Sequence, residues 1–286
     1  MVNILITGSK GQLGSEIKAI AGDFPHFNFL FTDIEELDVT DSEQVRKFVA
    51  DHEPDVIINC AAYTAVDRAE EEPEKAMWIN RDAVSNLAGA CDRNDCYLVH
   101  ISTDFVFDGE NTKPYTEDDI PCPTSVYGLS KLDGEEAMMA CLQKGMIIRT
   151  SWLYSSFGNN FVKTIINKCR ELGELNVVND QVGTPTYARD LAVAILSILP
   201  AAMSSGQFGI FHYSSTGSCT WYEFAGEITR LAGLSCRINP VKTGVYPAKA
   251  RRPAYSVLDS SLIRERFGIT IPGWKESLRE CLKVIG

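Results

Sequence analysis

The sequence predicts an α/β fold in which a doubly wound parallel sheet carries a smaller, interleaved C-terminal lobe. Short apolar segments alternate with segments of helical period through the first half of the 286 residues. The apolar segments are almost continuously hydrophobic, as strands are when helices cover both faces of a parallel sheet. A glycine-rich loop, residues 8–14, follows the first apolar segment directly. Together these three features are typical of a nucleotide-binding α/β domain.

The expected strands of this half share that apolar character and are residues 2–6, 27–31, 55–59, 97–101 and 146–148. Apolar positions recur at helical spacing in the segments between them, residues 12–21, 42–51, 73–93 and 127–142. Strand–helix–strand repetition at this spacing predicts a Rossmann-type sheet.

After Thr150 the alternation becomes less regular. Helices are expected at residues 159–172, 187–199 and 220–231, a strand at 208–213, and an amphipathic helix within 272–286. Thr220 is the expected N-cap of the third of these, because Glu223 stands at capping-box spacing.

The composition excludes several classes of protein. A hydrophobic content of 45% supports a large core, and a net charge of −11 disfavours a nucleic-acid binder, which needs a basic face. Nine cysteines without a CxxC pair point to reduced thiols rather than to a zinc ribbon. The first apolar segment is too short for a signal peptide, and no apolar run could span a membrane, so we expect a cytoplasmic protein.

The glycine loop predicts a dinucleotide site. Gly8, Gly11 and Gly14 would allow a tight turn and bring backbone N–H groups, at a helix N-terminus, close to a pyrophosphate. Asp33, at the end of the second strand, can accept hydrogen bonds from the adenosine ribose and would repel a 2′-phosphate. NADH is therefore slightly favoured, although Lys10 in the loop could offset the repulsion and permit NADPH.

A second group of residues predicts carbonyl reduction. Tyr127 and Lys131 lie four residues apart, on one face of the expected helix, and Thr103 ends the fourth expected strand. A tyrosine with a pKa near 10 can protonate an alkoxide if a nearby ammonium lowers that pKa. At about 4 Å the ammonium contributes on the order of 4 kcal/mol, or roughly three pKa units before desolvation. Thr103 can orient the carbonyl oxygen.

With these residues in place, the chain resembles the extended short-chain dehydrogenase/reductase superfamily, and within it the dTDP-4-dehydrorhamnose reductase family. The resemblance covers nearly the whole chain and is carried by GSKGQLG (8–14), NCAAYTAVDRAE (59–70), STDFVFDG (102–109), VYGLSKLDGE (126–135), RTSWLY (149–154), NNF (159–161), NDQVGTPT (179–186) and RRPAYSVLD (251–259).

The resemblance implies reduction of the C4 carbonyl of dTDP-4-dehydro-6-deoxy-L-mannose to dTDP-L-rhamnose by hydride from NAD(P)H. It implies cofactor contacts from Gly11, Gln12, Leu13, Asp33, Asp38, Val39, Ala62, Tyr63, Thr64 and Lys131, beside Gly8 and Gly14 of the loop. Thr103, Asp104 and Trp152 would contact the sugar, with Tyr127 as proton donor.

Two residues support the predicted nucleotide-sugar substrate independently of the family resemblance. Trp152 follows the fifth strand, where a ligand crevice should lie, and an indole face suits a sugar ring. Arg252 could pair with a diphosphate through two hydrogen bonds. We expect residues 1–151, completed by elements from about 174–200, to form the dinucleotide-binding domain, and residues 152–286 mainly the substrate lobe.

Two alternatives stay open. Another nucleotide-sugar reductase or epimerase would share Tyr127 and Lys131, whereas dehydratases typically place Asp-Glu after the threonine, where this chain has Asp104-Phe105. A non-catalytic regulatory subunit, like that of methionine adenosyltransferase, would also resemble this sequence.

Some relatives dimerise around Mg²⁺ held by three carboxylates. Glu16 matches the first of these positions, while Arg189 and Lys275 align with the others and cannot ligate Mg²⁺. A one-residue slip to Asp190 and Glu276 would restore three carboxylates. We expect no metal, and either a monomer or a metal-independent dimer.

Overall fold

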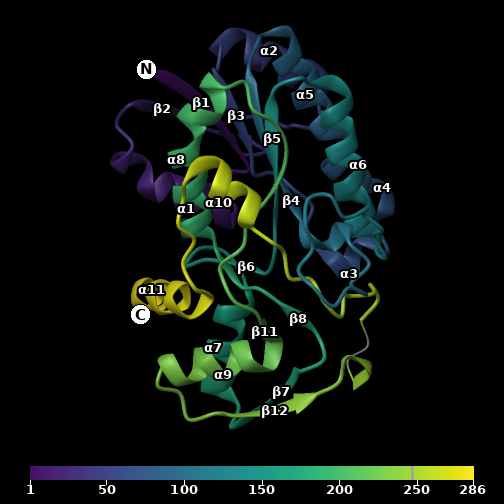
Figure 1. Ribbon diagram of the computed structural model, residues 1–286, viewed down its shortest axis with the longest axis vertical. Coiled ribbons are helices and arrows are strands. Elements are labelled where there is room, and N and C mark those ends of the chain that lie inside the picture. The colour runs from purple at the N-terminus through teal and green to yellow at the C-terminus, as the bar shows by residue number, and fades with distance from the viewer. Residues whose placement is uncertain (246–247) are drawn as a thin grey trace.

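The structure, a computed structural model, describes residues 1–245 and 248–286 and confirms the doubly wound α/β fold (Figure 1). Its main sheet has six strands in the order β10-β5-β4-β3-β1-β2, and each neighbouring pair is parallel. The strands are β1 (Val2–Thr7), β2 (Phe27–Phe31), β3 (Val56–Asn59), β4 (Tyr97–Thr103), β5 (Gly145–Thr150) and β10 (Phe208–His212).

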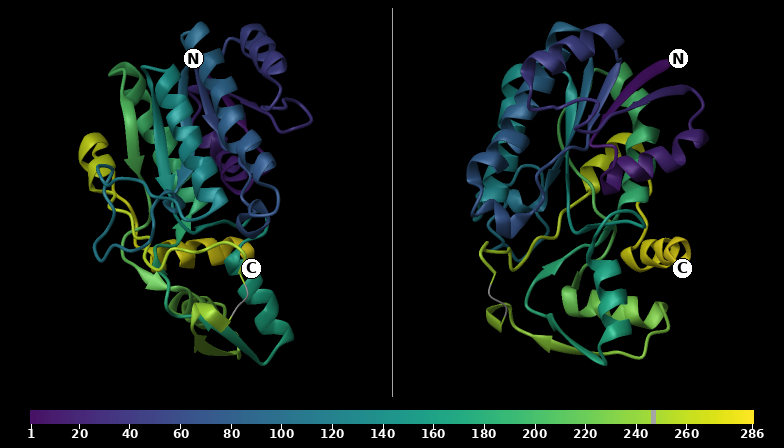
Figure 2. Two further views of the ribbon diagram at one scale, coloured as in Figure 1. Left: turned by 90° about the vertical axis from the view of Figure 1, so that its right-hand side faces the viewer. Right: turned by 180° about the vertical axis from the view of Figure 1, so that it is seen from behind.

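Helices cover both faces of this sheet, which explains its continuously apolar strands (Figure 2). Ile4 and Ile6 of β1 belong to the core on one face and Leu5 to the core on the other. The first face is covered by α1 (Gln12–Ile20) and α8 (Ala188–Ser204), and the second by α2 (Ser42–His52), α5 (Ala83–Arg93) and α6 (Val126–Cys141).

The segment expected as one helix at 73–93 is interrupted. It consists of α4 (Pro73–Met77), a π-helical turn η2 (Trp78–Asp82) and α5. A β-carbon added to Gly134 of α6 would collide with the carbonyl oxygen of Asn80, so glycine allows the widened turn to lie directly against α6. Such π turns occur frequently at functional sites.

A smaller lobe lies beyond the carboxyl ends of the strands (Figure 1). Its core joins α7 (Phe161–Glu171), α9 (Trp221–Leu231) and α11 (Trp274–Ile285) to a parallel pair of strands, β7 (Glu174–Val178) and β12 (Arg237–Val241). The expected capping box of α9 is confirmed, since the Thr220 hydroxyl accepts from the Glu223 N–H and the Glu223 carboxylate accepts from the Thr220 N–H.

The remaining elements are short. They are η1 (Ala21–Asp23), α3 (Val66–Ala69), η3 (Asp104–Val106), β6 (Leu153–Tyr154), β8 (Val182–Gly183), β9 (Thr186–Tyr187), β11 (Cys219–Thr220), η4 (Thr243–Val245) and α10 (Ser261–Phe267). Strand β6 pairs with β9, and β11 pairs with β8.

The chain passes between the two lobes more than once. Within residues 174–200, α8 packs against α1 beside the main sheet, whereas β7 pairs with β12 in the smaller lobe. Strand β10 then returns to the edge of the main sheet beside β5. We therefore propose a dinucleotide-binding unit made of residues 1–151 together with α8 and β10, and a substrate unit made of most of the remaining chain.

Candidate active site

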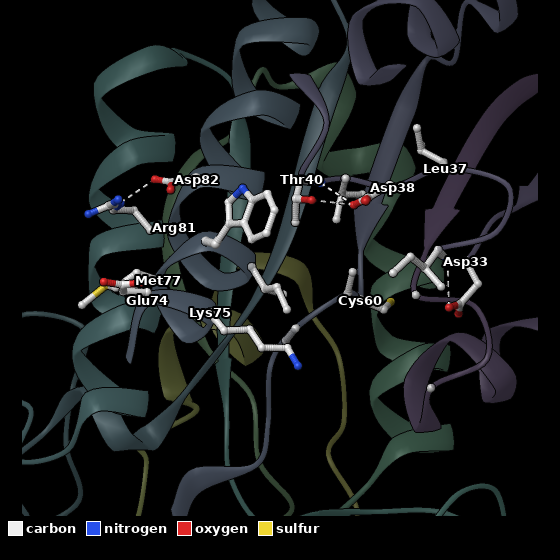
Figure 3. A pocket seen from close by; sticks show the side chains of 18 residues that line it. Asp33, Leu37, Asp38, Thr40, Cys60, Glu74, Lys75, Met77, Arg81 and Asp82 are labelled. Carbon is white, nitrogen blue, oxygen red and sulfur yellow. Dashed lines mark hydrogen bonds and ion pairs between the residues drawn. The ribbon is translucent and has the colours of Figure 1, made fainter. Parts of the chain in front are cut away.

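A crevice opens where the strand order reverses. The chain passes outward from β1 to β2 and then crosses back over β1 to β3, so the strand order reverses at β1. Ligands of doubly wound sheets bind at such a point. A cavity of about 940 Å³ occupies it. Figure 3 shows its two walls, with Asp33, Leu37 and Asp38 after β2 on one side and Lys75 and its helical neighbours on the other.

The glycines of the loop are required by close packing. Gly8 has φ +61°, and a β-carbon there would lie 2.6 Å from the Ala61 nitrogen. A β-carbon on Gly14 would lie 2.6 Å from the Gly8 carbonyl oxygen. Gly11 lines the cavity and is the N-cap of α1, where no side chain among the described residues caps the helix. The N-terminal N–H groups of α1 are therefore available to an anion.

Asp33 lies at the cavity with its carboxylate held by the backbone. One oxygen accepts from the Lys10 N–H at 2.8 Å and the other from the Ile34 N–H at 3.0 Å. The Lys10 ammonium pairs with Glu35 at 2.5 Å. The Lys10 charge, which sequence reasoning left free to meet a 2′-phosphate, is thus partly offset by an acidic partner.

The other predicted cofactor residues divide into two groups. Gly8, Asp38, Val39 and Ala62 line the cavity, although one Asp38 oxygen also accepts from the Thr40 N–H and hydroxyl. The second group is not among the described residues that line the cavity, and consists of Gln12, Leu13, Gly14, Tyr63, Thr64 and Lys131.

The far wall of the cavity is the part that sequence reasoning missed. It comes from α4 and the π turn η2, and includes Lys75, Met77, Trp78 and Arg81. The signal in the sequence was Trp78, an aromatic residue within the segment expected as one helix. In the structure the Trp78 side chain is 55% exposed. Only the fold places this segment opposite Asp33.

Thr103, Tyr127 and Lys131 are brought together at the carboxyl end of β4. The Ser125 hydroxyl accepts from the Gly128 N–H and caps α6, while Gly128 lets the first turn of α6 contact the Phe105 carbonyl of η3. This contact sets Tyr127 beside the Thr103 hydroxyl, to which it hydrogen bonds. All three side chains are buried, and Lys131 is only 1% exposed.

Burial shifts the pKa values of this group in opposite directions. It raises the pKa of Tyr127 to about 12, opposed by the hydrogen bond from Thr103 and assisted by the charge of Asp104. It lowers the pKa of Lys131 to about 8, opposed by the charge of Glu135. Lys131 Nζ donates to the Ile101 carbonyl at 2.7 Å. In each case burial favours the uncharged form, the phenol of Tyr127 and the amine of Lys131, so the two pKa values move apart in the protein without ligand.

Asp104 lies beside this group and is almost fully buried. Desolvation raises its pKa to about 6, against hydrogen bonds to Ser256 and Thr103. Its Oδ2 atom has no hydrogen-bond partner among the described residues. A buried carboxyl oxygen without a partner is costly, and a ligand hydroxyl would satisfy it.

A second cavity, of about 680 Å³, adjoins the Thr103–Tyr127–Lys131 group. Phe105 lines it and contacts the Tyr127 ring edge to face. Trp152 lines it too, with its indole stacked on Trp221 at a centroid distance of 3.5 Å. A β-carbon on Gly183 would collide with the Trp152 indole, which explains that glycine. Sequence reasoning missed Trp221, because the stack joins two distant segments.

Arg252 also lines the second cavity, but its guanidinium is engaged. It pairs with Asp67 at 2.5 Å, and the two side chains are 31% and 44% exposed. Arg252 is therefore positioned at the cavity by a carboxylate that an anionic ligand could replace.

The Glu16 carboxylate is held by other side chains of the same chain. The buried Glu16 carboxylate accepts from the Ser155 and Ser156 hydroxyls and pairs with Arg189 at 3.0 Å. Asp190 accepts from the Ser277 hydroxyl, and desolvation raises its pKa with smaller contributions from Glu276 and Glu16. In residues 1–245 and 248–286 no group of three His, Cys, Asp or Glu side chains could hold a metal ion. Lys275 lies over the Trp274 ring.

Comparison with known proteins places these features in context. A family described as RmlD substrate binding domain matches residues 2–286. The dTDP-4-dehydrorhamnose reductase of Sinorhizobium fredii is 40% identical over 97% of this chain and 96% of its own length. No helix within the described residues is long and apolar enough to cross a membrane.

Two solved structures are similar throughout. A dTDP-4-dehydrorhamnose reductase from Clostridium acetobutylicum shares 44% identity with a TM-score of 0.94 and 99% coverage of each chain. One from Bacillus anthracis, in complex with NADP, shares 38% identity with the same TM-score and coverage.

Proposed function

The chain belongs to the family described as RmlD substrate binding domain, and we propose that it reduces the C4 carbonyl of dTDP-4-dehydro-6-deoxy-L-mannose to dTDP-L-rhamnose with NAD(P)H. The observation that carries the proposal is the buried Thr103–Tyr127–Lys131 group, which adjoins the second cavity through Phe105. The first cavity has the features of a dinucleotide site, and the second is lined by aromatic side chains.

The residues of the first cavity fit a nicotinamide cofactor. The uncapped N-terminus of α1 and the glycine loop can hold a pyrophosphate, and Asp33 can meet the adenosine ribose. When bound, the cofactor supplies the hydride. Ala62, with its small side chain, leaves room above the end of β3 for the rest of the molecule.

The chain's own residues supply orientation and the proton. The Thr103 hydroxyl donates to the substrate carbonyl oxygen, and the Tyr127 hydroxyl transfers its proton to that oxygen as the alkoxide forms. The Lys131 ammonium favours the tyrosinate that remains. An ammonium 4 Å from a tyrosinate oxygen contributes about 4 kcal/mol at an effective dielectric of 20, which would oppose the desolvation that raises the pKa of Tyr127.

The second cavity suits the rest of the substrate. Trp152, which lines this cavity with its indole stacked on Trp221, can contact the sugar ring. The unpartnered oxygen of Asp104, which lies behind the cavity residue Ser256, can accept from a sugar hydroxyl. Arg252 can hold the diphosphate if that group replaces Asp67 as its partner, because guanidinium and phosphate form paired hydrogen bonds.

The deciding experiment measures NAD(P)H consumption with the dehydro-sugar nucleotide and identifies the product by NMR. Consumption equal to the amount of product, with the C4 configuration of L-rhamnose, supports the proposal. Another reductase would give a different product, and an epimerase would interconvert sugars without net consumption. A regulatory subunit would leave the trace flat.

Cofactor preference should depend on Asp33. We expect NADH to be used at least as well as NADPH, and Asp33→Ser to shift the kcat/KM ratio toward NADPH, because the substitution removes a charge that repels a 2′-phosphate. Steady-state kinetics with both cofactors measure the ratio. Glu35→Gln is an informative comparison, since it removes a neighbouring charge and, by freeing Lys10, should also move the ratio toward NADPH. An unchanged ratio in Asp33→Ser would mean that Asp33 does not meet the ribose.

Activity should survive removal of divalent metal ions. The Glu16 carboxylate is saturated by Arg189 and two hydroxyls, so we expect full turnover in EDTA and the same sedimentation coefficient with and without Mg²⁺. Arg189→Glu is an informative comparison, because it removes the cation from Glu16. A magnesium-dependent dimer of the unaltered protein, or activity lost in EDTA and restored by Mg²⁺, would contradict this expectation.

A further inference from the structure

His100 lies in the middle of β4, fully buried, between two nitrogen atoms. Its Nδ1 is 3.1 Å from Asn59 Nδ2, and its Nε2 is 3.3 Å from Lys131 Nζ. Both neighbours are hydrogen-bond donors in their ordinary forms. A neutral imidazole has one donor and one acceptor nitrogen, so it can accept from only one of them.

The orientation of the Asn59 amide decides which one. Asn59 Oδ1 accepts from the Thr7 hydroxyl at 2.7 Å and from the Ala61 N–H at 3.2 Å. Turning the amide over would set its NH₂ group against the Ala61 N–H and leave that backbone donor unsatisfied. Asn59 Nδ2 therefore donates to His100 Nδ1, and the imidazole proton is on Nε2.

That proton points at Lys131. Lys131 Nζ already donates to the Ile101 carbonyl. A neutral amine can accept the Nε2–H of His100 with its lone pair, whereas an ammonium ion has no acceptor to offer. The His100 contact therefore favours the neutral form of Lys131.

We propose that His100 is a positioning residue which, held in its Nε2–H form by Asn59, lowers the proton affinity of Lys131 and makes it a proton relay for Tyr127. The catalytic meaning of this relay rests on the proposed function. Tyr127 gives its proton to the substrate oxygen, the Lys131 ammonium returns one to the tyrosinate, and the resulting amine accepts from His100. The amine then regains a proton from water.

The surrounding charges are compatible with this role. On α6, Glu135 raises the pKa of Lys131, but its carboxylate is bound by Arg149 of β5 and by the Ser102 hydroxyl of β4. On η3, Asp104 faces Tyr127. Burial and the charge of Lys131 hold the pKa of His100 well below its ordinary value, so the imidazole stays neutral.

A second buried histidine gives an internal control. The Nδ1 atom of His212, on β10, is 3.0 Å from the Tyr115 carbonyl oxygen, which can only accept a hydrogen bond. Its Nε2 atom is 3.5 Å from Arg149 Nη1, which can only donate one. His212 must therefore carry its proton on Nδ1. The two histidines are expected to be opposite tautomers in the same protein.

The test is ¹⁵N NMR of the full chain labelled at histidine, with no cofactor added. We expect His100 to be protonated at Nε2 and His212 at Nδ1, with assignments made from His100→Gln and His212→Gln. The His100 signals should titrate with a midpoint near the Lys131 pKa of about 8, and Lys131→Met should abolish that titration. Protonation of His100 at Nδ1 would overturn the proposal.

Asn59→Asp supplies the reciprocal test. A carboxylate accepts from His100 Nδ1–H, so the tautomer should reverse and Nε2 should become an acceptor for the Lys131 ammonium. The basic limb of the kcat profile should then move up by at least about one pH unit, because the ammonium is retained at higher pH. Asn94→Asp, which adds the same charge before β4 begins, should not move it.

The outcomes separate the two proposals. An unchanged tautomer and basic limb in Asn59→Asp would overturn the role of His100. The NMR result for the unaltered protein decides the tautomer even if that variant does not fold. If both histidines show the expected tautomers but the protein has no reductase activity, the proposed function alone is overturned. If the protein is fully active but His100 is protonated at Nδ1, the role of His100 alone is overturned.

Discussion

Tyr127→Phe is expected to lower kcat by at least about 10²-fold while cofactor affinity hardly changes. The substitution removes only the hydroxyl that protonates the alkoxide, and general acids contribute about 10²–10⁴-fold. Thr103 and Lys131 would remain to orient the substrate. Stopped-flow measurement of hydride transfer and fluorescence titration with NAD(P)H separate the two effects.

Two variants serve as comparisons. Tyr97→Phe removes another buried tyrosine hydroxyl, which donates to the Gln207 carbonyl at the opposite end of β4, and should leave kcat unchanged. Lys131→Met should impair both turnover and cofactor binding, because we assign it two roles. Turnover close to the unaltered enzyme in Tyr127→Phe would remove Tyr127 from the mechanism.

Breaking the ion pair between Glu135 and Arg149 is expected to destabilise the protein by about 3–5 kcal/mol. Both side chains are about 1% exposed, and the guanidinium donates to both carboxylate oxygens, with Arg149 Nη2 at 2.6 Å from Oε2. Glu135→Gln keeps the shape but leaves the Arg149 charge buried without a counter-charge. Urea unfolding of the variant and the unaltered protein measures the difference.

An exposed pair supplies the control. Arg46 and Glu43 lie 3.8 Å apart on α2 with most of their surface in solvent, so Glu43→Gln should cost less than about 1 kcal/mol. The double variant Glu135→Leu, Arg149→Met should recover much of the lost stability, because it removes both buried charges. A cost below about 1 kcal/mol for Glu135→Gln would show that Arg149 finds other partners, with the nearby His212 the first to consider.

Features that depend on neighbouring residues were predictable from the sequence. The strand at Phe27–Phe31 has the predicted ends, and α9 begins at its predicted capping box. The glycine loop and the spacing of Tyr127 and Lys131 were equally readable. Each depends on backbone geometry, on helical or strand period, or on a cap, and these act over a few residues.

Features that join distant segments were decided by the tertiary structure. Sequence reasoning did not find the pairing of β7 with β12, the Trp152–Trp221 stack, or the cavity wall at Trp78. Arg189 and Glu16 are 173 positions apart, and their pairing gives Glu16 a partner that no local pattern indicates.

The same holds for the hydrogen bonds around Lys131. His100 and Asn59 are 41 positions apart, and they meet because β3 and β4 are neighbours in the sheet with Asn59 paired to His100 in register. Sequence alone predicted a catalytic role for Lys131. The position of His100 beside Lys131 was set by strand order and register. These determine which buried polar groups lie close enough to hydrogen bond to one another away from water.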